Sequence, residues 1–419
     1  MTSRLRNWAG NLTYAATAVH RPTSVAELAD LVARTPRIRA LGTRHSFSPV
    51  ADGSELVTLD GLPAVLEVAP DRRSVSVSAG ARYGEIGPAL HAHGLALANL
   101  ASLPHISVAG SVATGTHGSG HRLGSLATQV SGLEMITATG DVVELRRDRD
   151  IQRLNASVVG LGALGVVTQL TLDVVPAFDV RQYVHEVPSL RPVVDGIDDV
   201  LDVAYSVSVF TDWQSSHQVW VKEMAADEPH HHGAGWLGGQ PADGPRHPVA
   251  GQDAGRATEQ LGVAGPWHER LPHFRLDHTP SSGDELQSEY LVDRADARAA
   301  LVALLDLRDL VSPVLQVSEL RTVAADELWL SPAYRRDSLA VHFTWLPDAA
   351  AVLPVVAEVE RALGSFAPRP HWGKVFTIPP DEVRAVYPQA DAFRALATDT
   401  DPDGRFRNRM LDEYLPAYS

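Results

Sequence analysis

The chain of 419 residues contains no cysteine. It therefore has no disulfide bond, no thiolate metal ligand and no cysteine nucleophile, and this absence is uninformative about compartment. No apolar run approaches the length of a membrane span, and residues 1–11 contain no apolar core of signal-peptide length. These absences favour a soluble, cytoplasmic protein with no membrane partner.

Basic residues are in the minority: the sequence has 36 Lys and Arg against 51 Asp and Glu, a formal net charge of −15 at pH 7. Such an excess of negative charge disfavours nucleic acid and anionic membrane surfaces as partners. Hydrophobic residues make up 44% and charged residues 21% of the chain, as in ordinary globular proteins. The length predicts about two to three domains.

Two short motifs resemble a dinucleotide-binding site and a zinc site, but the residues around or within them do not support either function. Residues 160–165 match G-x-G-x-x-G, but a strand pattern follows where a dinucleotide-binding Rossmann unit needs a helix. His268 and His273 resemble the zinc motif H-E-x-x-H, but the spacing is one residue too long and a proline interrupts it. Segment 227–256, rich in Gly, Pro, His and Asp, predicts a mobile surface loop, and its histidines 230–232 leave zinc binding open as a minor alternative. We expect no metal site.

The first part of the chain mixes short helices and strands. A capping pattern at Ser24, followed by apolar residues at helical spacing, predicts a helix that ends before Pro36, and the apolar run 38–41 predicts a strand after it. We place the first domain boundary at Pro176. The other elements expected before it are strands at 56–59, 64–68 and 74–79, a helix at 83–93, a hairpin at 135–145 and a strand at 166–175.

The second part, 177–371, shows clusters of strands with helices inserted between them, which favours an α+β domain with an antiparallel sheet. The tail, 372–419, holds one expected helix at 381–396 and is too short for a core of its own, so it must pack on an earlier part of the chain. The elements expected in the second part are strands at 203–210, 217–222, 286–292, 313–323 and 338–346, and helices at 294–310 and 348–363.

Residues 42–47 combine a glycine, two hydroxyls, a cation and an imidazole directly after the strand ending at Leu41. Ligands often bind at this end of strands in α/β sheets, and such a turn can present backbone N–H groups to an anion. We hypothesise that this loop binds the pyrophosphate of a flavin dinucleotide and that His45 is bonded covalently to the flavin. The alternative is a surface turn with an ordinary histidine. Segment 99–120, rich in small residues and glycine, should form a poor packed helix and can lie close against a ligand.

Two strands carry one polar face each. The alternation of a strand places Glu319 and Arg321 on one face, and His342 and Thr344 on the face opposite an apolar Val, Phe and Trp. The two polar faces could line a polar cavity, or they could form a solvated sheet face with an ion pair. Lys374 stands beside Gly and Trp, where a lysine is either a buried charge for chemistry or a chain that reaches out to solvent.

Together these stretches resemble the alditol oxidases, which are flavoproteins of the vanillyl-alcohol-oxidase type. The resemblance extends over nearly the full length, in one order, and is strongest in segments 42–47, 101–120, 285–290, 319–326 and 371–374. It implies an α+β, two-domain FAD-binding oxidase with an antiparallel-sheet substrate domain. In that arrangement residues 1–176 form the FAD domain, 177–371 form the substrate domain, and 372–419 return to the FAD domain.

The resemblance also implies the cofactor-binding residues. His45 would be the covalent link to FAD, and one departure stands beside it: the family often has a second glycine just before this histidine, whereas this chain has Arg44. The other residues implied to line the cofactor are Leu41, Gly42, Thr43, Arg44, Ser46, Ser102, Ser107, Gly110, Thr114, Gly115, Thr116, His117, Val167 and His371.

The implied reaction is oxidation of the terminal primary hydroxyl of alditols such as xylitol and sorbitol to the aldose, with dioxygen reduced to hydrogen peroxide. The residues implied to bind the polyol are Ser102, Gln287, Glu319, Arg321, His342, Thr344 and Lys374. Among them we expect His342 to be the base, Arg321 and Lys374 to stabilise negative charge, and Glu319 to hold a hydroxyl and Arg321.

Other classes stay open from the sequence. The nearest is an aldonolactone oxidase or dehydrogenase of the same fold; more distant ones are a sugar-binding protein without turnover and a zinc hydrolase. The expected partners are a small polyol and dioxygen, and the expected oligomeric state is a monomer.

Overall fold

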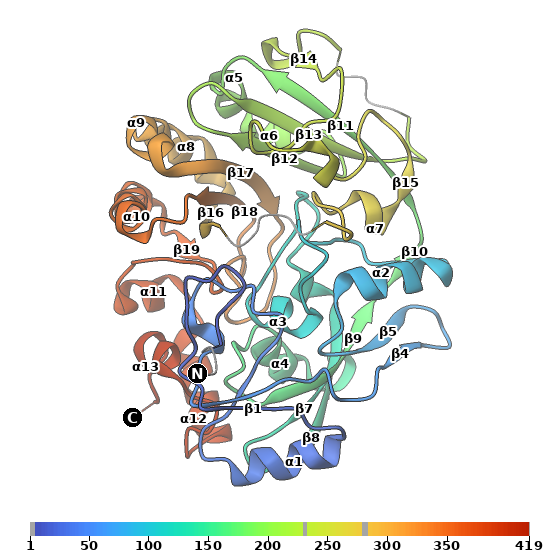
Figure 1. Ribbon diagram of the computed structural model, residues 1–419, viewed down its shortest axis with the longest axis vertical. Helices are drawn as coiled ribbons and strands as arrows, with labels where there is room; N and C mark the ends of the chain where they lie inside the picture. Colours follow the sequence, from blue (N-terminus) through green and yellow to red (C-terminus); the bar gives the residue numbers. More distant parts are fainter. Residues whose placement is uncertain (1–4, 229–232, 279–283, 419) are drawn as a thin grey trace.

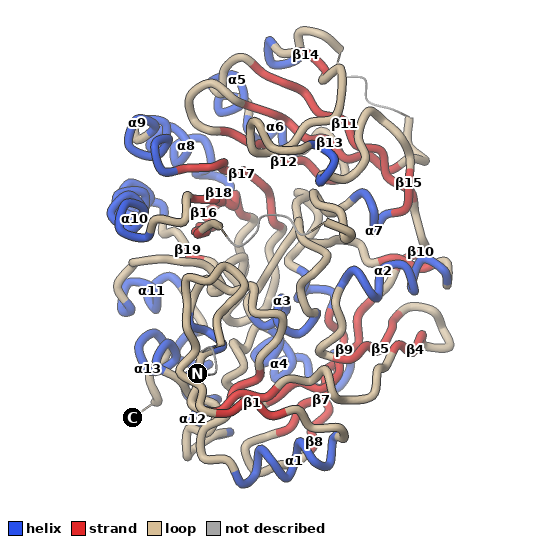
Figure 2. The backbone as a smooth tube through the Cα atoms, viewed as in Figure 1, coloured by secondary structure: helices blue, strands red, loops and turns tan. Residues whose placement is uncertain are grey.

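The computed structural model describes residues 5–228, 233–278 and 284–418. It contains two large, mainly antiparallel sheets with helices packed around them (Figure 1). Long loop segments lie between the two sheets (Figure 2). The three histidines 230–232, where zinc binding was left open, lie outside the described residues. Among the helices of the described part, none combines the length and the apolar character that crossing a membrane requires.

The chain begins with a small parallel sheet that supports the loop at 42–47. The side chain of Ser24 accepts a hydrogen bond from the Glu27 amide and caps the predicted helix, which is confirmed. The predicted strand after it is only two residues long. The elements here are β1 (Ala18–His20), α1 (Val25–Arg34), β2 (Arg39–Ala40), the 3₁₀ turn η1 (Pro49–Ala51) and β3 (Glu55–Val57), in the sheet order β1-β3-β2.

A five-stranded antiparallel sheet follows, in the order β4-β5-β9-β7-β8. The predicted hairpin and the long strand before Pro176 are confirmed, but helix α4, which starts with a run of charged residues, was not predicted. The six-residue helix α3 also forms inside the segment expected to make a poor helix. The elements are β4 (Leu66–Val68), β5 (Ser74–Ser78), α2 (Tyr83–Ala92), β6 (Leu95–Ala96), α3 (Val108–Ala113), η2 (Leu126–Gln129), β7 (Val130–Ile136), β8 (Val142–Arg146), α4 (Arg147–Val158), β9 (Val166–Asp173) and β10 (Val175–Pro176).

The larger sheet has nine strands and contains all five strands predicted for it. Its order is β14-β11-β13-β12-β17-β18-β16-β19, with β15 paired to β11, and β11 was not predicted. Its strands are β11 (Asp179–Val187), β12 (Ser206–Thr211), β13 (His217–Met224), β14 (Gln240–Pro241), β15 (Gly265–Pro266), β16 (Leu286–Asp293), β17 (Leu315–Val323), β18 (Ser338–Trp345) and β19 (Arg369–Pro370).

Helices cover one face of this sheet, where the inward-pointing Val, Leu, Phe and Trp side chains form one core. The helix predicted at 294–310 is divided into a 3₁₀ turn and two helices, while α10 matches the helix predicted at 348–363. The helical elements in this part of the chain are α5 (Arg191–Asp195), α6 (Ile197–Leu201), η3 (Trp236–Gly238), η4 (Ala254–Arg256), α7 (Trp267–Arg270), η5 (Arg294–Asp296), α8 (Ala297–Leu305), α9 (Arg308–Val311), η6 (Ser312–Val314), α10 (Ala349–Leu363) and η7 (Gly364–Phe366); of these, α7 packs into the core of the five-stranded sheet.

The tail forms three helices, α11 (Pro380–Val386), α12 (Ala390–Thr400) and α13 (Arg409–Tyr414), where one was predicted. Pro388 separates the first two, because proline interrupts a helix interior. Apolar residues of all three helices join the same core as those of the five-stranded sheet. The tail therefore packs on the first part of the chain. The assignment of domains to 1–176, 177–371 and 372–419 stays a prediction.

Candidate active site

A cavity of about 1310 Å³ is lined by residues of both large sheets and of the loops between them. Sites for small ligands usually measure roughly 300–1,000 Å³, so this cavity has space for a large ligand and a small one together. Every residue predicted for the cofactor or the substrate lines it except Gly115. Gly115 has φ +72° and faces Pro332 instead, so it serves the turn that ends α3.

The loop at 42–47 lies against the start of α3. An added Cβ at Gly42 would come 2.6 Å from Ser107 Oγ, and one at Gly110 would come 2.7 Å from the same atom. The Ser107 amide donates to Thr43 Oγ1 at 3.2 Å, which holds the two segments together. Two backbones free of side chains at this point form a cradle for a ligand that must approach closely, as a dinucleotide does.

Arg44 has φ 63°, in the left-handed region that glycine adopts most easily. The resemblance implied a glycine at this position, and the backbone here has the left-handed conformation that suits glycine although the residue is arginine. The Arg44 guanidinium donates to the Arg6 carbonyl at 3.2 Å, and the Arg44 carbonyl accepts from the Trp8 amide at 2.8 Å. These bonds to the N-terminal segment hold the loop in its conformation.

His45 projects from this loop into the cavity, with its ring stacked on Trp8 at 5.2 Å between centroids. Its buried Nδ1 has no hydrogen-bond partner among the described residues. Burial, with a smaller contribution from neighbouring positive groups, lowers the pKa of His45 to about 4. The imidazole is therefore neutral at neutral pH and keeps a nitrogen lone pair for bonding, which fits a covalent cofactor link.

The opposite wall is the polar face of three adjacent strands. The register places Glu319 of β17 beside His342 of β18, and His342 beside Glu289 of β16. Two residues further along the same pair of strands, Gln287 of β16 lies beside Thr344 of β18. All five side chains are buried and line the cavity, so the alternative of a solvated sheet face is wrong.

Arg321 joins the two carboxylates of this wall. Its Nη2 lies 2.5 Å from Glu289 Oε1, its Nε lies 3.5 Å from Glu319 Oε2, and its Nη1 donates to Ser102 Oγ at 3.4 Å. Burial alone would raise the pKa of both carboxyl groups, but Arg321 and nearby histidines outweigh it and lower both pKa values. Both carboxylates are therefore anionic at neutral pH and accept hydrogen bonds.

Glu289 was not predicted as a site residue. Its Oε1 lies 3.3 Å from His117 Nε2, and its Oε2 lies 3.5 Å from His342 Nδ1. It therefore links a histidine predicted for the cofactor with one predicted for the substrate. The pattern could have revealed it, because it stands two residues after Gln287 and so on the same face of the strand.

His342 is buried, and burial lowers its pKa although Glu289 acts in the opposite direction. The ring is therefore neutral at neutral pH. The carboxylate near Nδ1 favours the tautomer with its proton on that nitrogen, which leaves Nε2, 3.2 Å from Thr344 Oγ1, as a proton acceptor.

Lys374 reaches the same cavity from the segment after β19. Its Nζ donates to Gln287 Oε1 and lies 5.2 Å from the centre of the Phe47 ring. The Phe47 amide donates to the Gly373 carbonyl at 2.7 Å, which joins this segment to the loop at 42–47. Burial lowers the pKa of Lys374. The lysine is thus half-buried, and its side chain lines the cavity.

The chain is similar to known proteins over nearly its full length. Residues 16–146 match the model of an FAD binding domain, and residues 284–414 match the model of D-arabinono-1,4-lactone oxidase. The chain is 51% identical to the alditol oxidase of Streptomyces sp. (strain IKD472 / FERM P-14339) over 99% of its own length and 100% of that protein. The chain belongs to the FAD-dependent oxidases of the vanillyl-alcohol-oxidase type.

Other known proteins are similar at lower sequence identity. L-gulono-1,4-lactone dehydrogenase of Mycobacterium tuberculosis (strain ATCC 25618 / H37Rv) is 31% identical over 96% of each chain. Cholesterol oxidase from B. sterolicum superposes with a TM-score of 0.79 at 15% identity, covering 99% of this chain and 96% of that one. A chitooligosaccharide oxidase gives 0.78 at 14% identity, covering 99% and 94%. The predicted α+β flavoprotein fold of the vanillyl-alcohol-oxidase type is confirmed.

As an oxidase of this type, the protein uses FAD, takes a small-molecule substrate and reduces dioxygen. The rejection of the Rossmann motif at 160–165 agrees with the structure, where helix α4 precedes this segment and strand β9 follows it. In the described part of the chain, no three His, Asp or Glu side chains come together as metal ligands would. His273, rejected as a zinc ligand, lines the cavity, although no role was predicted for it.

Acidification should destabilise this oxidase through its buried neutral histidines. Burial lowers the pKa of His371 to about 3 and of His273 to about 4, against about 6.5 in an unfolded chain. Above pH 6.5 both states are neutral and these groups contribute nothing; below it only the unfolded chain binds protons, so folding weakens as the pH falls toward 4. We expect about 1 kcal/mol lost per histidine between pH 6.5 and 5.5.

The measurement is the Tm of the flavin-loaded protein from pH 7.5 to 5. His371 Nδ1 accepts from the Gly373 amide at 3.0 Å, a contact that an Asn side chain can reproduce. His371→Asn should therefore flatten the decline of Tm with pH. An equally steep decline in this variant would contradict the role of His371.

Proposed function

We propose that this oxidase converts the terminal CH₂OH of alditols such as xylitol and sorbitol to the aldehyde, giving the aldose, while dioxygen becomes hydrogen peroxide. A polyol carries no charge and no carbonyl, so its recognition needs many hydrogen bonds. The buried polar face of β16, β17 and β18 supports the proposal most, because it supplies donors and acceptors together. The full-length identity of 51% to an alditol oxidase points the same way.

We propose that residues 1–176 together with 372–419 hold FAD and that 177–371 bind the substrate. The match to an FAD binding domain lies within the first range. When bound, FAD supplies the two-electron oxidation and returns the electrons to dioxygen. His45 would be its covalent anchor. Residues that would line it are Leu41, Gly42, Thr43, Arg44, Ser46, Ser102, Ser107, Gly110, Thr114, Thr116, His117, Val167 and His371.

Proton transfer would fall to His342. Oxidation of an alcohol releases the hydroxyl proton, and the Nε2 of a neutral, buried imidazole can accept it. Glu289 near Nδ1 keeps the ring in the required tautomer and stabilises the imidazolium that forms. The loss of the proton leaves negative charge on the substrate oxygen, which Lys374 and Arg321 would stabilise.

The remaining polar groups would hold the rest of the carbon chain. Glu319 is an acceptor for a hydroxyl proton, while Ser102, Gln287 and Thr344 can both donate and accept. Arg321 contacts Ser102 and both carboxylates, so it sets the spacing of these groups.

An aldonolactone oxidase or dehydrogenase is the second candidate, because residues 284–414 match the model of a lactone oxidase. Peroxide release with xylitol and sorbitol, compared with gulono- and galactono-lactone, separates the two. We expect kcat/KM to be at least about tenfold higher for the alditols, a preference of about 1.4 kcal/mol. A preference for a lactone would overturn the proposal.

The remaining predictions concern the setting of the protein. A monomeric state, a cytoplasmic location and the absence of nucleic-acid or membrane partners stay predictions. Light scattering of the purified protein and fractionation of the cells that make it are the measurements that check them.

A further inference from the structure

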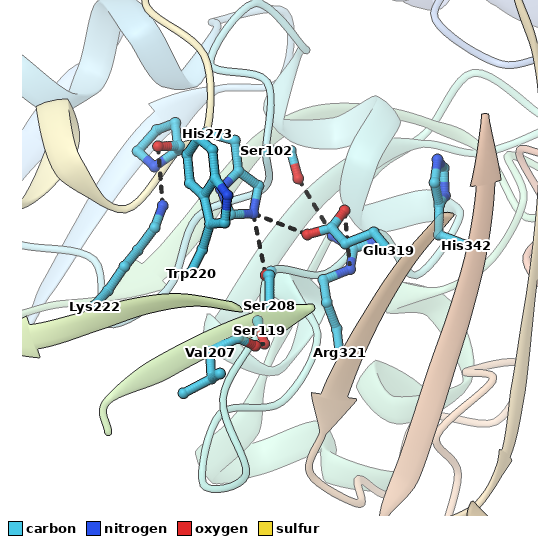
Figure 3. A network of polar contacts seen from close by, with 12 residues as sticks. Ser102, Ser119, Val207, Ser208, Trp220, Lys222, His273, Glu319, Arg321 and His342 are labelled. Carbon is cyan, nitrogen blue, oxygen red and sulfur yellow. Dashed lines mark hydrogen bonds and ion pairs between the residues drawn. The ribbon is translucent and has the colours of Figure 1, made fainter. Parts of the chain in front are cut away.

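His273 lines the cavity beside the substrate wall and contacts Glu319 directly (Figure 3). Its Nε2 lies 2.9 Å from Glu319 Oε1 and 3.2 Å from Ser208 Oγ. The rings of Phe210 and Trp220 meet it edge-on at 5.2 and 5.6 Å between centroids. The imidazole is therefore held in one orientation by aromatic packing, with one nitrogen directed at the carboxylate.

The protonation of this contact follows from its surroundings. Burial, with a further contribution from Lys222, lowers the pKa of His273 to about 4, so the ring carries a single proton at neutral pH. An ionised carboxylate only accepts hydrogen bonds, so that proton lies on Nε2 and His273 donates to Glu319. One oxygen of Glu319 is thereby bound by His273, while the other lies on the side of Arg321.

The backbone around His273 holds a second site residue. The amides of His273 and Phe274 both donate to the Ser102 carbonyl, at 3.2 and 3.3 Å. Ser102 Oγ in turn accepts from Arg321, the partner of Glu319. The segment 271–274 thus fixes Glu319 through a side chain and Ser102 through the main chain.

Lys222 anchors this segment from strand β13. Its Nζ is buried, donates to the Leu271 carbonyl and donates to the Pro272 carbonyl at 3.1 Å. The side chain of Thr258 also donates to the Pro272 carbonyl, at 2.7 Å. A buried amino group that donates to two buried carbonyls is costly to displace, so these bonds hold the segment against the sheet.

We propose that His273 is a positioning residue for alditol recognition, which orients Glu319 by its side chain and Ser102 by its backbone so that both bind hydroxyls of one substrate. This inference rests on the proposed alditol oxidation. It assigns a role to His273, which was rejected as a zinc ligand because of its spacing from His268. It also makes the segment 271–274 a determinant of substrate specificity.

The experiment compares two substitutions at one position in the flavin-loaded protein. His273→Phe keeps the ring volume against Phe210 and Trp220 but removes the donor, whereas His273→Gln can place an amide N–H near the position of Nε2. We expect KM for xylitol to rise at least about tenfold in His273→Phe, with a smaller change in kcat, because a hydrogen bond to a charged group is lost. His273→Gln should bring KM back to within about threefold of the wild type.

Two further variants separate positioning from a merely structural role. In a Glu319→Gln background, adding His273→Phe should change KM by less than about twofold, because the two residues act through one contact. His268→Phe is the matched control: this histidine is the other member of the motif and does not line the cavity, so its KM should equal that of the wild type.

The possible outcomes separate the two proposals. A wild type that releases no peroxide from any alditol would overturn the proposed function and this inference with it. An active wild type with KM within twofold in His273→Phe, or with fully additive effects in the double variant, would overturn the role of His273 alone. A lowered Tm in His273→Phe with KM unchanged would also overturn that role, since it would show that the residue serves stability and not positioning.

Discussion

Replacing Lys374 with methionine is expected to lower kcat for alditol oxidation about a hundred- to a thousandfold, while the protein stays yellow. Methionine keeps most of the length and apolar body of the side chain but removes its charge. Lys374 donates to the amide oxygen of Gln287 and lies over the Phe47 ring, so the substitution removes one hydrogen bond and one contact with an aromatic face. The protein should therefore still fold, and the lower kcat should reflect weaker stabilisation of the transition state.

Arg321 would be a poorer test of the same idea. It pairs with Glu289 and Glu319, and removing it would leave two buried carboxylates without their main counter-charge, at a cost of about 3–5 kcal/mol. A loss of activity there would not distinguish chemistry from unfolding.

The measurement is peroxide release over a range of xylitol concentrations, together with the visible absorbance of the flavin. Lys374→Arg is the matched variant: it keeps a positive charge and should lose clearly less activity than Lys374→Met. Near-normal kcat in Lys374→Met would remove this residue from the mechanism.

Replacing His45 with alanine is expected to abolish the covalent attachment of the flavin. The neutral imidazole of His45 lies in the cavity with an unpartnered Nδ1 among the described residues, and alanine offers no nucleophilic atom. After acid precipitation the flavin should stay with the wild-type protein and pass into the supernatant with His45→Ala. Flavin that still precipitates with the variant would place the link at another residue.

Arg44→Gly is the matched control for this experiment, because it changes the neighbouring residue and leaves the imidazole in place. Glycine adopts the left-handed conformation of Arg44 without the steric cost of about 1–2 kcal/mol. The variant should therefore keep its flavin through acid precipitation. If it released the flavin as His45→Ala does, the hydrogen bond from the Arg44 guanidinium to the Arg6 carbonyl would be required for attachment.

Several elements could be predicted because their signals are local. The helix α1 has its cap at Ser24 and its apolar spacing within eleven residues, and the hairpin of β7 and β8 is closed by a short turn. Strand β11 and helix α4 escaped prediction. The charged start of α4 precedes a buried apolar end that its packing explains. In the tail, Pro388 divides the one expected helix into α11 and α12, and α13 was not predicted.

The candidate site was predictable in part for the same reason. Period-two alternation places Glu319 with Arg321, and His342 with Thr344, on single faces, and that is a property of each strand alone. The contact between Glu289 and His342 depends on the register of two strands far apart in sequence, which alternation does not specify. His273 was rejected as a zinc ligand because its spacing from His268 does not fit the zinc motif H-E-x-x-H. The structure nevertheless brings His273 into contact with Glu319.

The sequence by itself therefore determined the class of protein and the polar faces of the strands, and it predicted the loop at 42–47 as a cofactor site, since these depend on residues close together along the chain or on full-length resemblance. The tertiary structure decided that the two faces line one buried cavity, that Arg321 joins two carboxylates there, and that His273 and Glu289 belong to the same network. The physical reason is that burial, strand register and the pairing of buried charges arise from contacts between distant segments. No local pattern specifies those contacts.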